Sequence, residues 1–231
     1  MGVSIVLPNG IKFRFYIPLP GGNAPRWWTV LELVVVSILV QAGLWINGTT
    51  RGKIILLGMV WLALTTLWDK TSPKEMGLSF KNFRENLWLI EPVAIALSLI
   101  WLTGLLTGSA RQTKVPGVFL EHKFGYVLGA FFQQFVMQSY VFTRLQKLTP
   151  EKATWITAIF FSLSHVPNPA LMVIALVGGW ASNRIFAVQR SLPALGLAHG
   201  VIGAAMAEFL PGWLMLAGGG FLRWFLRWYN A

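Results

Sequence analysis

The sequence predicts an all-α fold, a polytopic transmembrane helical bundle, from its composition and from how its apolar residues are grouped. Of 231 residues, 55% are hydrophobic and only 12% are charged, whereas a soluble domain typically carries about 25% charged residues. The apolar residues gather in long stretches, and a helix needs about 20 of them to cross a bilayer. These features exclude a soluble domain and indicate an integral membrane protein with about eight spans.

The expected spans follow one another along the chain, separated by charged or turn-forming residues such as Asn47-Gly48 and Asp69-Lys70. In order they are 27–47, 54–68, 87–106, 124–143, 153–166, 169–188, 191–210 and 212–226. The second, fifth and eighth are short. Together they form one transmembrane domain, residues 27–231.

Residues 1–26 precede the first span and are expected to lie on the cytoplasmic membrane surface. Lys12 and Arg14 alternate with aromatic residues, and Asn9-Gly10 is typical of a tight turn. This pattern favours a small hairpin, and a disordered tail is the alternative.

The positive charge of the chain, a net +11, predicts its orientation. Along an eight-span path, fourteen Lys and Arg residues lie on the side of the termini and five on the other. Because cytoplasmic loops carry the excess of positive charge, both termini are expected in the cytoplasm, with the protein in the cell inner membrane. The basic loops are expected to contact membrane lipids. A nucleic-acid partner is not expected, because no basic stripe interleaved with aromatic residues lies outside the spans.

Five polar side chains interrupt the apolar spans: Gln133, Gln134, Gln138, His165 and His199. In hydrocarbon an unpaired amide or imidazole costs on the order of several kcal/mol, so these groups are expected to face one another, a ligand or water. They define a candidate site between the fourth, fifth and seventh spans. The chain has no Cys, which excludes a thiolate nucleophile, a thiolate metal site and a disulfide.

The order of these residues resembles the CPBP family of intramembrane proteases, which includes the type II CAAX prenyl endopeptidases and bacteriocin-processing proteins. The family pattern is Glu-Glu-x-x-x-Arg, then Phe-x-x-x-His, then His-x-x-x-Asn. In this chain Gln133 and Gln134 occupy the two Glu positions and Gln138 occupies the Arg position. The first motif is therefore altered at all three of its defining residues.

The other two motifs are closer to the family. Phe161 and His165 match the second motif, and His199 matches the third, with Gly203 where Asn is expected. Met76-Gly77-Leu78 resembles the family's loop before the third span. The resemblance covers about residues 70–210 and implies a CPBP-type bundle.

The altered first motif predicts impaired catalysis. The resemblance implies that the first Glu would activate a water molecule, assisted by the histidines. A Gln amide has no ionisable form near neutral pH and cannot accept that proton. His165 or His199 could act as the base alone, since histidine titrates in the right range, but we expect the rate to fall by orders of magnitude.

The substitutions also leave a neutral cluster, because the two acids and the base are replaced together. An Arg without its carboxylate partner would be penalised in the membrane, and removing both relieves that cost. Three retained amides favour a cluster that is still used, either as hydrogen-bonding contacts between helices or as a ligand site. Phe161, Gly203 and Asn183 are the further candidates for binding residues.

No cofactor is indicated by the sequence. A metal at His165 and His199 is not expected, because two histidines alone are too few good ligands and amide oxygens bind zinc poorly. One His could ligate a haem or chlorophyll, but nothing else in the sequence points to one. Glu32, Glu91 and Glu208 lie within or near spans and are candidates to replace the missing base. Glu208 is expected to face away from His199, about half a turn out of phase on a regular helix, and Glu32 and Glu91 are expected to reach the interface.

Three functions remain open at this stage. The leading hypothesis is a catalytically impaired family member that binds a hydrophobic ligand (a lipid, isoprenoid, peptide segment or tetrapyrrole) or a membrane-protein partner. The second is a divergent intramembrane endopeptidase that uses His165 and His199. The third is a structural subunit of a membrane protein complex.

Overall fold

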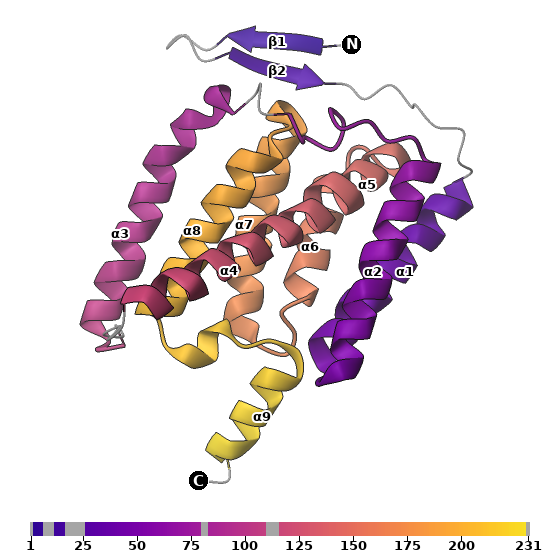
Figure 1. The fold of residues 1–231 in the computed structure, drawn as a ribbon. Coiled ribbons are helices and arrows are strands. Elements are labelled where there is room, and N and C mark those ends of the chain that lie inside the picture. The colour runs from indigo at the N-terminus through magenta and orange to yellow at the C-terminus, as the bar shows by residue number, and fades with distance from the viewer. Residues whose placement is uncertain (1, 7–11, 17–25, 80–82, 110–115, 230–231) are drawn as a thin grey trace.

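The computed structural model describes residues 2–6, 12–16, 26–79, 83–109 and 116–229 of the chain. Its helices run side by side through one body; two strands lie across one end, and the C-terminal helix leaves at the other (Figure 1). The predicted helical membrane bundle is confirmed.

The first two helices form an antiparallel pair. α1 (Arg26–Trp45) and α2 (Thr49–Trp68) are joined by a short turn in which Gly48 has φ 72°, a conformation that glycine adopts at little steric cost. α2 begins before the predicted residue 54 and takes in Arg51 and Lys53, which are exposed. Long basic side chains can reach the membrane surface from a helix end, so they do not interrupt the span.

The third and fourth predicted spans are also helical. η2 (Arg84–Leu89) leads directly into α3 (Ile90–Leu106). The fourth span is the middle of a much longer helix: α4 (Pro116–Gln134) continues into a π-helical stretch, η3 (Phe135–Phe142), and then into α5 (Thr143–Leu148). π-helical turns often occur at functional sites, and this one contains Gln138.

Three further helices complete the bundle. These are α6 (Ala153–Leu163), α7 (Pro169–Gln189) and α8 (Leu192–Phe209). α7 begins with a favourable cap, because the Asn168 Oδ1 atom accepts a hydrogen bond from the Leu171 backbone N–H at 3.2 Å and Pro169 occupies the first turn.

Length and apolar composition make five of the described helices able to cross a membrane: Arg26–Trp45, Thr49–Trp68, Arg84–Leu106, Pro169–Gln189 and Leu192–Phe209. In Arg84–Leu106 only 11% of the apolar window is buried inside the protein, and Ile95, Leu99 and Leu106 are exposed. An outward surface this apolar suits lipid rather than water. The chain is an integral membrane protein.

The last predicted span, 212–226, is not a single helix long enough to cross a membrane. It consists of a short 3₁₀ turn, η4 (Gly212–Met215), and α9 (Gly218–Tyr229), a helix of 12 residues. At 1.5 Å per residue α9 is about 18 Å long, too short for a hydrocarbon core of about 30 Å. As a result α9 and the N-terminal strands lie at opposite ends of the bundle (Figure 1), which differs from the expectation that both termini share one side.

The N-terminal strands, β1 (Gly2–Val6) and β2 (Lys12–Tyr16), pair antiparallel, with Gly2 opposite Tyr16 and Val6 opposite Lys12. The predicted turn at Asn9-Gly10 lies outside the described residues. β2 lies against α7, so this segment covers one end of the bundle.

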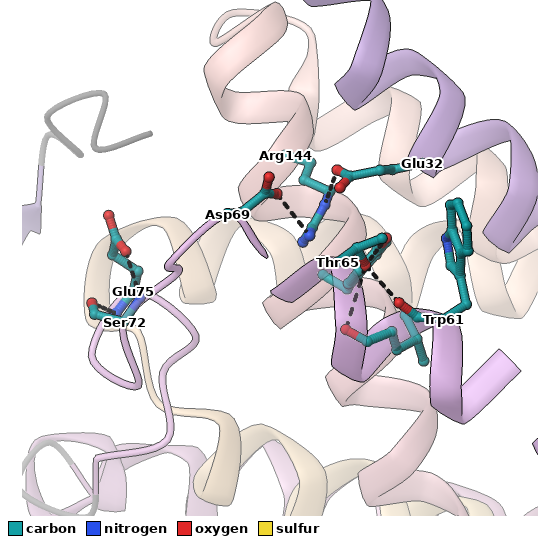
Figure 2. A network of polar contacts seen from close by, with 9 residues as sticks. Glu32, Trp61, Thr65, Asp69, Ser72, Glu75 and Arg144 are labelled. Carbon is teal, nitrogen blue, oxygen red and sulfur yellow. Dashed lines mark hydrogen bonds and ion pairs between the residues drawn. The ribbon is translucent and has the colours of Figure 1, made fainter. Parts of the chain in front are cut away.

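A buried ion network joins α1, the end of α2 and α5. The Arg144 guanidinium donates from Nε to Glu32 Oε2 at 2.7 Å and from Nη2 to Asp69 Oδ2 at 2.9 Å, and Figure 2 shows it between the two carboxylates. Its Cζ atom lies 3.5 Å from the centroid of the Tyr140 ring, whose hydroxyl is 2.8 Å from Thr65 Oγ1. The network corrects the expectation for Glu32, which is 0% exposed and does not reach the interface.

The loop after α2 is held at the same end of the bundle. Ser139 Oγ donates to the Met76 carbonyl at 2.6 Å, the Leu192 N–H donates to the Gly77 carbonyl at 2.9 Å, and Arg190 Nη1 donates to the Glu75 carbonyl at 2.9 Å. Burial lowers the pKa of Arg190 to about 10, so the side chain stays charged at neutral pH.

We expect Arg144→Leu to destabilise the protein by about 3–5 kcal/mol, because it leaves two buried carboxylates without their counter-charge. Thermal unfolding in mild detergent, followed by Trp fluorescence, measures the change. Lys147→Leu, on the same helix α5, is the matched control and should change stability by about 0.5 kcal/mol or less. The combination Glu32→Gln, Asp69→Asn and Arg144→Leu should recover part of the loss. Equal stability of Arg144→Leu and the control would contradict the assigned role.

Candidate functional site in the helix bundle

Two histidines and one phenylalanine meet between α6 and α8. Phe161 is in the last turn of α6, His165 is in the turn that follows, and His199 is on α8. The Phe161 ring centroid lies 5.0 Å from that of His165 and 5.8 Å from that of His199, edge to face in both cases. The structure therefore brings together the matched residues of the second and third motifs.

The two imidazoles differ in their hydrogen bonding. His165 Nδ1 lies 2.8 Å from the Phe161 carbonyl oxygen, a contact that fixes the ring over the end of α6. His199 Nδ1 is buried and has no hydrogen-bond partner in the described structure. Because an unpaired buried nitrogen is costly, His199 is the group here with unused capacity for a ligand or water.

The turn that carries His165 is fastened on two sides by residues that the sequence analysis did not single out. Gln41 Nε2 of α1 donates to the Leu163 carbonyl at 3.0 Å. The Asn168 amide, 0% exposed, donates to three backbone carbonyls in and beside η4: Trp213 at 3.0 Å, Leu214 at 3.3 Å and Leu216 at 3.1 Å. Asn before Pro is a helix-start signal, but the carbonyls it binds are not visible in the sequence.

The three glutamines lie in different environments. Gln133 is exposed, Gln134 is buried, and Gln138 is 1% exposed inside η3. Gln138 Nε2 donates to Asn183 Oδ1 on α7 at 3.0 Å, and Asn183 Nδ2 donates to the Thr154 carbonyl on α6 at 3.1 Å. The position that resembles the family's Arg thus belongs to a neutral hydrogen-bonded chain across three helices.

Gly203 stands at the position of the Asn in the family's third motif. The space beside it is filled by a side chain of α4. A Cβ atom on Gly203 would lie 2.5 Å from the Tyr126 ring and hydroxyl. Gly196 and Gly200, earlier on α8, receive Phe131 and Val127 of α4 in the same way. Close approach of α4 to α8 therefore occupies the space in which a larger side chain would stand.

The candidate residues fall into two groups. The histidines surround Phe161, and Gln138 pairs with Asn183. Across the part of the chain that the structure describes, no hydrogen bond joins one group to the other, and no three His, Asp or Glu side chains gather in a way that could hold a metal. Polar groups inside a helical membrane bundle, arranged around Phe-x-x-x-His and a second His, resemble those of one class of membrane protein, the intramembrane proteases.

Comparison with protein families agrees with this class. Residues 115–205 match the family model described as "Type II CAAX prenyl endopeptidase Rce1-like". The match runs from the start of α4 into α8 and contains all three motifs. It is consistent with the CPBP family, so the resemblance stated from the sequence is confirmed for this part of the chain. Comparison with curated proteins gives no match, and comparison with solved structures gives none either.

We expect Gly203→Ala to destabilise the protein by about 1–3 kcal/mol, because its methyl group would overlap the Tyr126 ring. Gly178→Ala on α7 is the matched control, since a Cβ there meets no atom within 4 Å. Thermal unfolding of both variants measures the difference. Adding Tyr126→Ala to Gly203→Ala should recover stability relative to Gly203→Ala alone. Equal effects of the two glycine substitutions would contradict the packing described here.

Proposed function

We propose that this protein is a catalytically impaired relative of the CAAX-type intramembrane endopeptidases, which binds a hydrophobic ligand or a membrane-protein segment without cleaving it. The observation that carries the proposal is the neutral pairing of Gln138 with Asn183. It stands where the family pattern has the Arg of an acid-base motif.

Two buried acids, Glu32 and Asp69, cannot easily replace the missing base. Glu32 and Asp69 both bind Arg144, and in the described structure neither carboxylate is hydrogen-bonded to His165 or His199. The histidines could accept a proton, since the His165 Nδ1–H donates to the Phe161 carbonyl and leaves Nε2 as the acceptor. Without a carboxylate to stabilise the imidazolium, general-base catalysis loses most of its effect.

A lateral groove in the surface of the bundle supports the proposal that the ligand is hydrophobic. It has a volume of about 390 Å³ and lies between α1, the η3–α5 segment and α6. Its walls are almost wholly apolar, including Val34, Ile38, Val141, Ile156 and Phe160. Phe160 adjoins Phe161 in the sequence, so the groove and the histidine cluster share α6. A hydrocarbon chain fits this lining, since such sites are mostly apolar with few polar groups.

The distribution of basic residues supports an orientation. Among the described residues, eleven Lys and Arg lie on elements at the end of the bundle with the strands, and five lie toward the end with α9. By the positive-inside rule the strand end faces the cytoplasm, and α9 lies on the opposite side of what we take to be the cell inner membrane. The proposal therefore keeps the expected cytoplasmic N-terminus but not the expected cytoplasmic C-terminus.

Ligand binding is tested by native mass spectrometry of the protein purified from its own membrane in mild detergent. We expect a bound hydrophobic molecule or protein segment in the natural chain. Val34→Trp, which fills the groove, should lower its occupancy about tenfold. Ile95→Trp is the matched control, because Ile95 is an exposed apolar residue on α3, away from the groove. His165→Ala and His199→Ala report whether the histidines contribute. An empty monomer in every preparation would contradict the binding proposal.

Restoring the family residues tests the impairment directly. We expect the natural chain not to cleave a lipid-modified peptide in proteoliposomes, and the combination Gln133→Glu, Gln134→Glu and Gln138→Arg to gain measurable cleavage. Adding His165→Ala should abolish that gain, and Trp fluorescence checks the fold of each variant. Cleavage by the natural chain that is lost in His199→Ala would replace the proposal with the divergent-endopeptidase hypothesis. A stable co-purified protein complex without a ligand would favour the structural-subunit hypothesis.

A further inference from the structure

α9 is anchored at its first turn and by Trp224, whose ring stacks on that of Trp213 with 5.5 Å between centroids. The Gly218 N–H donates to the Val166 carbonyl at 2.7 Å, and the Gly218 backbone lies against the Leu44 carbonyl so closely that a Cβ atom would not fit. From Leu222 onward most side chains are exposed, up to 66% for Trp228 and 73% for Tyr229. In Figure 1 the helix projects from the end of the bundle.

The two sides of α9 differ sharply in chemistry. At 100° per residue, the apolar residues Phe221, Leu222, Phe225, Leu226, Trp228 and Tyr229 fall on one arc. Their rings form a continuous row, with Phe225 6.4 Å from Phe221, 6.2 Å from Trp228 and 6.4 Å from Tyr229 between ring centroids. Phe221, at the start of the row, is buried against the protein, whereas Phe225, Trp228 and Tyr229 are exposed. An exposed aromatic face of this size therefore requires an apolar surface to cover it.

The opposite arc carries Arg223 and Arg227, one turn apart, and no acidic residue follows Glu208 in the sequence. The side facing away from the aromatic row is therefore purely basic. Arg223 and Arg227 attract anions, and each basic residue close to a membrane surface adds appreciably to its attraction for anionic lipid. Charge complementarity thus identifies the partner as anionic rather than neutral.

We propose that α9 lies along the bilayer interface, with its aromatic row among the acyl chains and with Arg223 and Arg227 binding anionic phospholipid headgroups. The helix is too short to cross the membrane, and its composition is that of an interfacial helix: Trp and Phe on one face and basic residues on the other. Trp and Tyr are the residues enriched at headgroup depth. The partner is a lipid surface, and a second protein is the competing outcome.

The absence of Cys from the sequence makes a site-specific fluorescence test direct. Leu226→Cys places an environment-sensitive label on the apolar arc. Gly220→Cys is the matched control on the polar arc, where a Cβ atom meets only Leu216 at 3.9 Å. Each full-length variant is reconstituted in nanodiscs of phosphatidylcholine alone or with about one-third phosphatidylglycerol, the label emission is recorded, and brominated lipids are added as quenchers.

We expect the Leu226→Cys label to shift to shorter wavelength and to be quenched by brominated lipid, with about tenfold stronger preference for the anionic discs. The Gly220→Cys label should be quenched much less. Arg223→Gln with Arg227→Gln should remove the preference for anionic lipid, whereas Arg51→Gln with Lys53→Gln, exposed at the same end of the bundle, should leave it.

Either of two results would overturn the proposal. One is a Leu226→Cys label that remains in water in both lipids. The other is quenching that is equal in neutral and anionic discs, which would exclude headgroup binding by the two arginines. A label already shielded before reconstitution by a co-purified protein would assign the face to that protein instead. A membrane-impermeant thiol reagent, added outside intact cells, should label Gly220→Cys if α9 faces away from the cytoplasm.

Discussion

The buried ion network of Arg144 with Glu32 and Asp69 is the constraint on which the arrangement of the bundle depends. A charge in a low-dielectric interior is stable only next to its counter-charge, so α1, the end of α2 and α5 must meet at one place. Residues 115–205 carry the match to the protease family, whereas α1 and α2 lie outside it. The network therefore fastens the part of the chain without a family match to the part that has one.

The candidate site avoids the cost of buried charge in a different way, by using neutral amides in place of an ion network. Where the family pattern has charged residues, this chain has amides, and the Gln138 Nε2 amide group donates to another amide, Asn183. A neutral pair tolerates the membrane interior without a strict counter-charge. Acid-base catalysis depends on a group that can change its charge. The replacement of charged residues by amides lowers the cost of burying this cluster, but it also removes the group that catalysis needs. Binding does not need that group.

Much of the fold could be predicted from the sequence, because the bilayer forces long apolar stretches into helices. The helical spans and the approach of Phe161, His165 and His199 follow from local patterns and from the resemblance. The partners of Arg144 could not be predicted, since Glu32 is 112 residues away along the chain and nothing local pairs them. The sequence predicts a span at 212–226 because a single arginine, Arg223, lies there among apolar residues, whereas the helix itself, α9, has only 12 residues. The Tyr126 ring beside Gly203 depends on how closely α4 and α8 pack, which no single segment encodes.

The Asn168 amide has a consequence for how the protein is made. The carbonyls it binds belong to residues 45, 46 and 48 positions further along the chain. A ribosome therefore delivers α6 and α7 to the membrane before the last fastening of the turn between them has been synthesised. Until then the turn that bears His165 lacks these three hydrogen bonds and has the contacts to segments made before them, such as the one to Gln41. Completion of the histidine cluster is a late event of biogenesis, set by the order of translation.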